Sequence, residues 1–278
     1  MLDILYHDEH LVAINKPSGL LVHRSLIDAR AQAFAVQLTR DRIGQRVYPV
    51  HRLDRATSGV LLFALSGELA SQVSEQFVQR VVRKTYLALV RGHTDSEGRI
   101  DYPLKERLDR LADGLADRNK PAQAAITDYC AIEKRELPHP VGRYQTARYT
   151  LVSLSPHTGR KHQLRRHMKH IFHPIVGDTT YGDGRHNTFV REQFHCHRLM
   201  LHAAGLCLRH PVSKAMLELQ APLPSDMREP LRQMGFSIPA EVTTSATDTT
   251  RPIGATNTTD TTGATDTSAT PSDNAGPA

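Results

Sequence analysis

Apolar and polar positions near the start of the chain alternate in blocks that predict short strands. Residues 4–16, ILYHDEHLVAINK, hold two apolar runs on either side of the polar HDEH, which predicts a strand pair ending at Pro17. Residues 59–65, GVLLFAL, are apolar throughout, and this length and content predict a strand buried on both faces. The N-terminal quarter therefore predicts strands that pack into one core.

The rest of the pattern mixes helices with further strands. Ser66 is a good N-cap residue, and Leu69, Val73 and Phe77 recur at the four-residue spacing of one buried helix face. Because strands and helices do not alternate regularly, we expect an α+β fold, with a mostly antiparallel mixed sheet flanked by helices and loops. The other predicted elements are helices over 29–42 and 161–170, strands over 81–90, 149–154, 201–208 and 216–220, and a closing helix at 226–236 interrupted by Pro230.

Two segments are predicted to lie outside the packed core. Residues 241–278 contain 13 threonines and almost no large apolar side chain, so burial cannot offset the entropy of ordering them, and a disordered tail is expected. Residues 104–121 carry charges of both signs and predict a solvated insertion. The expected organisation is one folded domain over 1–240 followed by the threonine-rich tail.

Charge narrows the class of partner. The chain has a formal net charge of +6, and residues 241–278 contribute −4, so residues 1–240 carry +10. Such an excess favours a polyanion, either nucleic acid or an anionic membrane surface, although a solvated basic surface would have the same composition. The longest apolar run has six residues, far short of the roughly 20 that span a bilayer.

Location is predicted from the N-terminus and the cysteines. The first ten residues, MLDILYHDEH, lack the basic start and the apolar stretch of a secretory signal. Cys130, Cys196 and Cys207 form an odd, widely spaced set, which argues against a disulfide framework. We therefore expect a cytoplasmic protein with no membrane partner, and a monomer because no heptad seam is evident.

The motif at residues 51–59, HRLDRATSG, holds Asp54 between Arg52 and Arg55. Nearby positive charge keeps a carboxylate ionised, which suits a nucleophile and not a proton donor, although a structural salt bridge is the alternative. Glycoside hydrolases generally need two carboxylates, whereas one suffices when the leaving group is a stabilised anion such as uracil. If the enzyme reattaches that uracil through carbon, a second residue must receive the C5 proton, and a tyrosine near cationic groups is a candidate.

These motifs carry a resemblance. HRLDRATSG, NKPSGLLVH, RKTYLALVRG, TGRKHQLRRHM and HPIVGD resemble, in order, segments of the RluA family of pseudouridine synthases, over roughly residues 1–225. The resemblance implies the catalytic fold of that family without an N-terminal S4 module, and isomerisation of uridine to pseudouridine without cofactor or metal. By position it implies that Asp54 is the catalytic aspartate, that Tyr86 contacts the base and that Arg165 pairs with Asp54.

The same resemblance assigns the RNA contacts. Arg52 matches the arginine that enters the RNA stack when the uridine is extruded, and Leu201 resembles an apolar residue of the base pocket. A uridine inside stacked RNA must be flipped out before a carboxylate reaches it. Whether Asp54 attacks C1′, adds at C6 or abstracts a sugar proton stays open. Further RNA-binding candidates are Arg55, Lys84, Arg160 and Lys161.

Substrate choice is predicted less directly. Within the family the chain most resembles members that modify uridine 65 of tRNA, with no DNA partner; ribosomal RNA is the alternative substrate, and a noncatalytic RNA-binding protein is the alternative class. The 16 histidines also allow a metal hypothesis, which rests on two sets of residues: His162, His167, His170 and His173, and His195, Cys196 and His197 with His202. Their spacing lacks the pairing of a zinc site, so metal binding is not expected.

Overall fold

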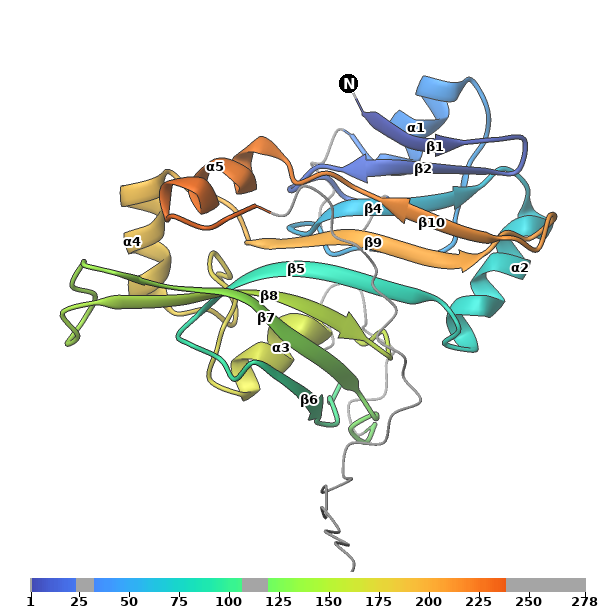
Figure 1. Ribbon diagram of the computed structural model, residues 1–278. Coiled ribbons are helices and arrows are strands. Elements are labelled where there is room, and N and C mark those ends of the chain that lie inside the picture. Colours follow the sequence, from blue (N-terminus) through green and yellow to red (C-terminus); the bar gives the residue numbers. More distant parts are fainter. Residues whose placement is uncertain (1, 24–32, 107–119, 239–278) are drawn as a thin grey trace, which may run out of the picture. The chain divides into compact units, whose positions relative to one another are not determined.

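Ten strands form a single mixed sheet in the computed structural model, which describes residues 2–23, 33–106 and 120–238 (Figure 1). Along the sheet the order is β1-β2-β4-β9-β5-β8-β7-β6, with β10 paired to β9 and β3 paired to β4. The strands are β1 Asp3–His7, β2 Leu11–Lys16, β3 Tyr48–Pro49, β4 Ser58–Ala64, β5 Arg83–Arg91, β6 Glu97–Asp101, β7 Ile126–Leu137, β8 Ala147–Pro156, β9 Leu201–Arg209 and β10 Met216–Gln220.

The pairing of β4 with β9 is parallel, and the other strand pairs are antiparallel. This confirms the predicted α+β class with a mostly antiparallel mixed sheet. Five helices belong to the described residues: α1 Ala35–Ile43, α2 Gly67–Val78, α3 Gln163–His170, α4 Gly184–Phe194 and α5 Ser225–Gln233.

Local sequence signals explain several of these elements. β1 pairs with β2 as predicted, and every residue of β4 is buried, as its apolar run requires. The Ser66 side chain accepts a hydrogen bond from the Leu69 N–H at 3.2 Å, which confirms the predicted cap of α2. Val73 is fully buried on that helix, and Leu69 and Phe77 pack against the same cluster.

Two helix predictions differ from the structure. The helix predicted over 29–42 begins at Ala35, because Phe34 has an extended backbone and forms a bridge with Leu21. Pro230 does not interrupt α5, which continues to Gln233. Met227 and Leu231 on that helix are fully buried, and their burial outweighs the backbone hydrogen bond that proline removes.

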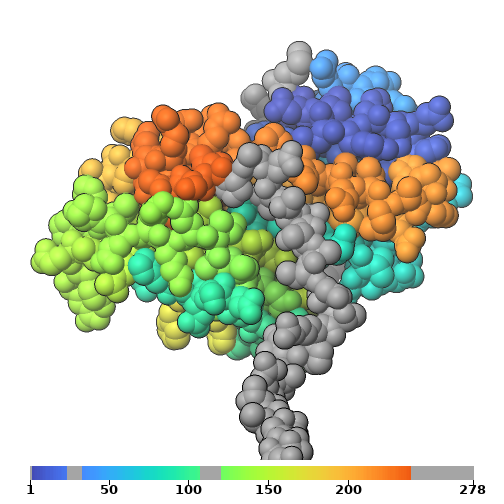
Figure 2. Space-filling view, in the orientation of Figure 1, coloured from blue at the N-terminus to red at the C-terminus, as the bar shows by residue number. Residues whose placement is uncertain are grey.

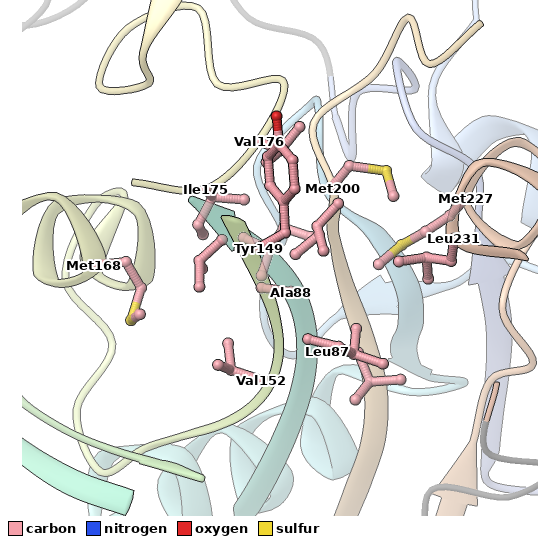
Figure 3. Packing of buried hydrophobic residues seen from close by; sticks show 14 of the residues in the cluster. Leu87, Ala88, Tyr149, Val152, Met168, Ile175, Val176, Met200, Met227 and Leu231 are labelled. Atoms are coloured by element: carbon pink, nitrogen blue, oxygen red, sulfur yellow. The ribbon is translucent and has the colours of Figure 1, made fainter. Parts of the chain in front are cut away.

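The core lies on both faces of the sheet. Around β2 and β4, side chains of α1 pack on one face and those of α2 on the other. A third cluster joins β5 and β8 to α3 and α5, with Leu87, Tyr149, Met168 and Met227 among its members (Figure 3). This cluster fixes α3, and with it the segment that carries Arg165.

Chain segments far apart in the sequence meet at the sheet. In Figure 2 the orange-red segment that includes α5 lies against the green segment that includes β7, and beyond α5 the Ser237 N–H donates to Glu133 Oε2 of β7 at 2.7 Å. Residues 107–119 of the insertion predicted over 104–121 lie outside the described residues, as does the tail predicted over 241–278. Leu104, the first residue of the insertion, forms a bridge with Gln123 through two backbone hydrogen bonds.

Candidate active site

Asp54 lies in the loop that enters β4. The Thr57 N–H donates to the Asp54 carbonyl at 3.0 Å and closes a turn, and the buried strand then begins at Ser58. Gly59 has φ +116°, and a Cβ there would lie 2.1 Å from the Ala203 carbonyl oxygen. Only glycine lets β4 pass β9 this closely, so the close crossing holds the end of the Asp54 loop in place.

The buried Lys16 ties this loop to the preceding one. Its Nζ donates to the carbonyls of Pro17 at 3.0 Å, Leu20 at 2.8 Å and Arg55 at 3.1 Å. Burial lowers the pKa of Lys16 to about 7, with a further contribution from the positive Arg198. Lys16 therefore holds the Asp54 loop against the loop of residues 17–20.

Further hydrogen bonds join the same two loops. The Gly19 N–H donates to the Arg55 carbonyl at 2.8 Å, and Arg55 Nε donates back to the Gly19 carbonyl at 3.0 Å. Ser18 Oγ donates to the Ala56 carbonyl at 2.8 Å. Arg55, predicted as an RNA contact, thus also has a structural role, because its Nε holds the Asp54 loop against the loop that contains Gly19.

A buried carboxylate holds Arg165 beside Asp54. Arg165 Nε donates to Asp178 Oδ2 at 2.7 Å and its NH2 donates to Oδ1 at 2.8 Å, while NH1 lies 3.5 Å from Asp54 Oδ2. The Asp178 side chain is fully buried, whereas that of Asp54 is 29% exposed. Asp54 is therefore the acid that a substrate can reach.

The environment of Asp178 keeps it ionised. Burial by itself would raise the pKa of this carboxyl, but the Arg165 hydrogen bonds and the backbone N–H groups of Tyr181 and Thr180 together hold it below its usual value. The pKa of Arg165 is raised. Burial by itself would lower it, but the hydrogen bonds and negative charges of Asp178 and Asp54 outweigh that effect. The predicted pairing of Arg165 with Asp54 exists, but the stronger partner is Asp178, which the sequence analysis did not select.

His162 and Tyr181 complete the surroundings of Asp54. His162 Nε2 lies 3.9 Å from Asp54 Oδ2, and its Nδ1 lies 3.1 Å from the Tyr181 hydroxyl. Arg165 Cζ sits 5.1 Å from the centre of the Tyr181 ring. His162 has φ 55° at the start of α3, and burial lowers its pKa. Spacing alone suggested this histidine only as a metal ligand and did not indicate its position beside Asp54.

Tyr86 lies on β5, near enough to Asp54 for the carboxylate charge to act on its phenol. It pairs with Leu154 on one side and Ala203 on the other, and its side chain packs against two core clusters while staying half-buried. Burial, and then the negative charge of Asp54, raise the pKa of Tyr86. The negative charge of Asp54 thus acts on the phenol, which disfavours a phenolate base.

The predicted RNA-contact cations are distributed around the site. Arg52 is exposed in the Asp54 loop, and Lys161 is exposed just before α3. Lys84 Nζ donates to the Thr158 carbonyl at 3.4 Å, and burial lowers the pKa of Lys84. Arg160 is half-buried, with Nε donating to the Ala124 carbonyl at 3.2 Å.

Leu201 is 3% exposed and begins β9, where it pairs with Ala88. It belongs to the apolar cluster against which Tyr86 packs. Leu201, the predicted base-pocket residue, is thus almost fully buried in a cluster against which Tyr86, the predicted base contact, also packs.

A buried polar network lies behind the loop. His202 Nε2 donates to the Ala221 carbonyl at 3.1 Å, since a carbonyl only accepts, so Nδ1 accepts from Ser58 Oγ at 2.8 Å. Arg198 NH2 donates to Ser58 Oγ at 2.6 Å, and its NH1 donates to Asp226 at 2.7 Å. Burial lowers the pKa of His202 to about 4, which leaves the ring neutral. These contacts connect the first residue of β4 to α5.

A cavity of about 770 Å³ opens beside this network. We name it the Arg198 cavity. Its walls include Arg55 and Ala56 from the Asp54 loop, Arg165 and Asp178, the residues His195, His197, Arg198 and Leu199 that follow α4, and Asp226.

The described residues provide neither a metal site nor a membrane-spanning helix. Over residues 2–23, 33–106 and 120–238, no three His, Cys, Asp or Glu side chains are grouped so as to hold a metal ion. Within the same ranges, no helix combines the length and apolar character needed to cross a membrane.

Known proteins are similar to this chain in sequence and in fold. Residues 10–170 match the family described as RNA pseudouridylate synthase. "tRNA pseudouridine synthase C" of Haemophilus influenzae is 53% identical over 236 residues, covering 85% of this chain and 99% of that protein. The protein of the same name from Vibrio cholerae is 52% identical, covering 85% and 97%.

Solved structures are also similar. "Human RNA Pseudouridylate Synthase Domain Containing 4" superposes with a TM-score of 0.64 and 30% identity, covering 85% of this chain and 94% of that one. "Human RNA Pseudouridylate Synthase Domain Containing 1" has a TM-score of 0.62 and 27% identity, covering 81% and 84%. Fold and sequence therefore lead to the same group of proteins.

Proposed function

Because the chain belongs to the RNA pseudouridylate synthase family, we propose that it converts a uridine of tRNA into pseudouridine and that Asp54 is the reacting group. The tRNA substrate is inferred from relatives named tRNA pseudouridine synthase C, which align with about 85% of the chain at 52–53% identity. The catalytic roles are inferred from the geometry around Asp54.

The unequal exposure of two acids is the observation that carries this proposal. Arg165 contacts both Asp54 and Asp178, but Asp178 is fully buried and bound by the guanidinium, whereas Asp54 is 29% exposed. Hydrolysis of a glycosidic bond generally uses two carboxyl groups that flank the sugar. One accessible carboxylate suits a reaction in which uracil leaves as a stabilised anion and is kept by the enzyme.

The atoms balance without a cofactor. The bond from C1′ to N1 of uracil breaks, the base turns, a bond from C1′ to C5 forms, C5 loses a proton and N1 gains one. Asp54 can act by attack at C1′, by addition at C6 or by abstraction of a sugar proton, and each route needs the base flipped out of its stack. The exposed Arg52 is suited to replace part of the lost stacking, and Tyr86 and Leu201 supply a wall for the base.

Within tRNA we propose uridine 65 as the target, on the resemblance of the chain's motifs to family members that modify this position. The test uses the purified full chain with bulk tRNA and with ribosomal RNA from a strain that lacks the enzyme, followed by mapping of pseudouridine at single-nucleotide resolution. Product at uridine 65 alone is the expected result. Product in ribosomal RNA alone would overturn the tRNA assignment.

A noncatalytic RNA-binding protein on the same scaffold is the competing class, and Asp54→Asn separates the two. An enzyme should lose its product while RNA affinity stays within about tenfold, because phosphate contacts supply most of that affinity. Asp41→Asn, an exposed aspartate of α1, is the matched control and should retain full activity. Wild-type protein that binds tRNA but makes no pseudouridine would favour the binding protein.

A further inference from the structure

The Arg198 cavity is next to Asp54 but is not the space around its carboxylate. Arg55 and Ala56, which follow Asp54 directly in the chain, form part of its wall, and Arg165 lines it while also contacting Asp54. A ligand in this cavity would thus be close to Asp54, because Arg55 in the cavity wall is the next residue in the chain. The volume of about 770 Å³ is within the range of pockets that hold a ligand the size of a nucleotide.

The charged groups of the wall leave the cavity suited to an anion. Asp178 is already bound by Arg165, and Asp226 accepts from Arg198 at 2.7 Å, so neither carboxylate is an unpaired negative charge. The wall contains three guanidinium groups, those of Arg55, Arg165 and Arg198, and two carboxylates, so the formal charge of these five groups is +1. The balance of the lining charge is positive, which favours a phosphate over a cation.

Two histidines supply donors that nothing else uses. His195 and His197 are exposed and line the cavity, and within the described part of the chain neither makes a hydrogen bond or an ion pair. His195 has φ 53° at the end of α4, the left-handed conformation that directs the chain into the cavity wall. Imidazole N–H groups donate to phosphate oxygens, and the rings can stack on a base.

We propose that the Arg198 cavity binds the nucleotide covalently adjacent to the target uridine, with His195 and His197 contacting its phosphodiester. This inference rests on the proposed function, since it needs an RNA strand whose target uridine is at Asp54. An RNA strand that has its target uridine at Asp54 would enter the cavity where it passes Arg55. An isolated phosphate would fill only a small part of its volume, so a nucleotide is the better fit.

The test pairs a protein change with a chemical change in the RNA. Short RNA substrates carry one uncharged methylphosphonate, either 5′ or 3′ of the target uridine, and kcat/KM is measured for wild type and for the double variant His195→Ala, His197→Ala. Both histidines are exposed, so the variant should fold. On natural RNA the variant should lose about tenfold in kcat/KM, as expected when phosphate contacts are removed.

Coupling between the two changes is the decisive result. At one of the two linkages the methylphosphonate should cost wild type about tenfold and the variant less than about threefold, because each change removes the same contact. A methylphosphonate several nucleotides away should affect both proteins equally. His7→Ala, an exposed histidine of β1 outside the cavity wall, should behave as wild type.

Independent effects at both linkages, or a double variant as active as wild type, would overturn the inference. An equal response to inorganic phosphate as a competitor in wild type and variant would argue against it in the same way. If wild type makes no pseudouridine in any RNA, the proposed function fails first, and that outcome is distinct from a working enzyme without coupling.

Discussion

Arg165 binds Asp178 through two nitrogens, at 2.7 and 2.8 Å, and directs its third nitrogen to Asp54 at 3.5 Å. Asp178, the buried acid, therefore orients the guanidinium that also contacts Asp54, the exposed acid. Asp178 touches no reacting atom in this arrangement and is a positioning residue. Its removal should affect both the fold and the reaction.

Asp178→Asn should lower the free energy of unfolding by about 3–5 kcal/mol, because Arg165 would be left as a buried charge without its partner. The displaced guanidinium should also lower kcat about 100-fold, as small misplacements of catalytic groups do. Denaturant unfolding and single-turnover kinetics measure the two effects. Asp183→Asn, which breaks the Arg91–Asp183 ion pair at 2.5 Å outside the site, is the control and should reduce stability without changing kcat.

The buried Lys16 predicts a pH dependence of stability. Its pKa falls from 10.5 in the unfolded chain to about 7 in the folded one, so between these values the unfolded chain holds the extra proton. The free energy of unfolding should then rise with pH, by up to about 1.4 kcal/mol per pH unit, from pH 7 toward pH 10. Below pH 7 both states are protonated and this slope disappears.

Lys16→Met isolates this effect. The difference in unfolding free energy between wild type and Lys16→Met should grow in favour of wild type from pH 7 to pH 9.5. Lys105→Met, at an exposed lysine, should differ from wild type by a constant amount. A constant difference for Lys16→Met as well would contradict the lowered pKa.

Gly59→Ala should destabilise the fold by at least about 2 kcal/mol, since the new Cβ would lie 2.1 Å from a backbone oxygen of Ala203 at a φ of +116°. Gly184→Ala at the start of α4 meets no atom within 4 Å and should stabilise by about 0.5–1 kcal/mol. Thermal and denaturant unfolding measure the stability of both variants, each of which adds one methyl group at a glycine. Equal effects would show that the β4–β9 crossing tolerates a side chain.

Tyr86 should act as a neutral phenol. Because burial and Asp54 raise its pKa, the wild-type rate between pH 8 and 10 should show no increase that follows tyrosine ionisation. Tyr86→Phe should lower kcat/KM by about tenfold or more, the effect of losing a buried hydrogen bond to the base, and keep the same profile. A profile that rises with pH in wild type and is flat in the variant would instead identify Tyr86 as the base; the exposed Tyr144→Phe serves as control.

Much of the local architecture was predictable because it depends on neighbours in the chain. The apolar run of β4 determines a buried strand, and Ser66 determines where α2 begins. Pro230 shows the limit, because its effect on α5 depends on what Met227 and Leu231 contact. Burial of those side chains is a property of the whole fold and not of the helix sequence.

The sequence by itself determined the β1–β2 pair, the buried strand β4 and the Ser66 cap of α2, since short-range sterics and hydrophobic periodicity decide these features. The tertiary structure alone decided that Arg165 belongs to Asp178 as well as to Asp54, which is 111 residues away in the chain. It also decided that burial lowers the pKa of Lys16 to about 7 and that His162 lies beside the reacting carboxylate. Charge pairing and desolvation depend on which groups meet in space, and composition does not contain that information.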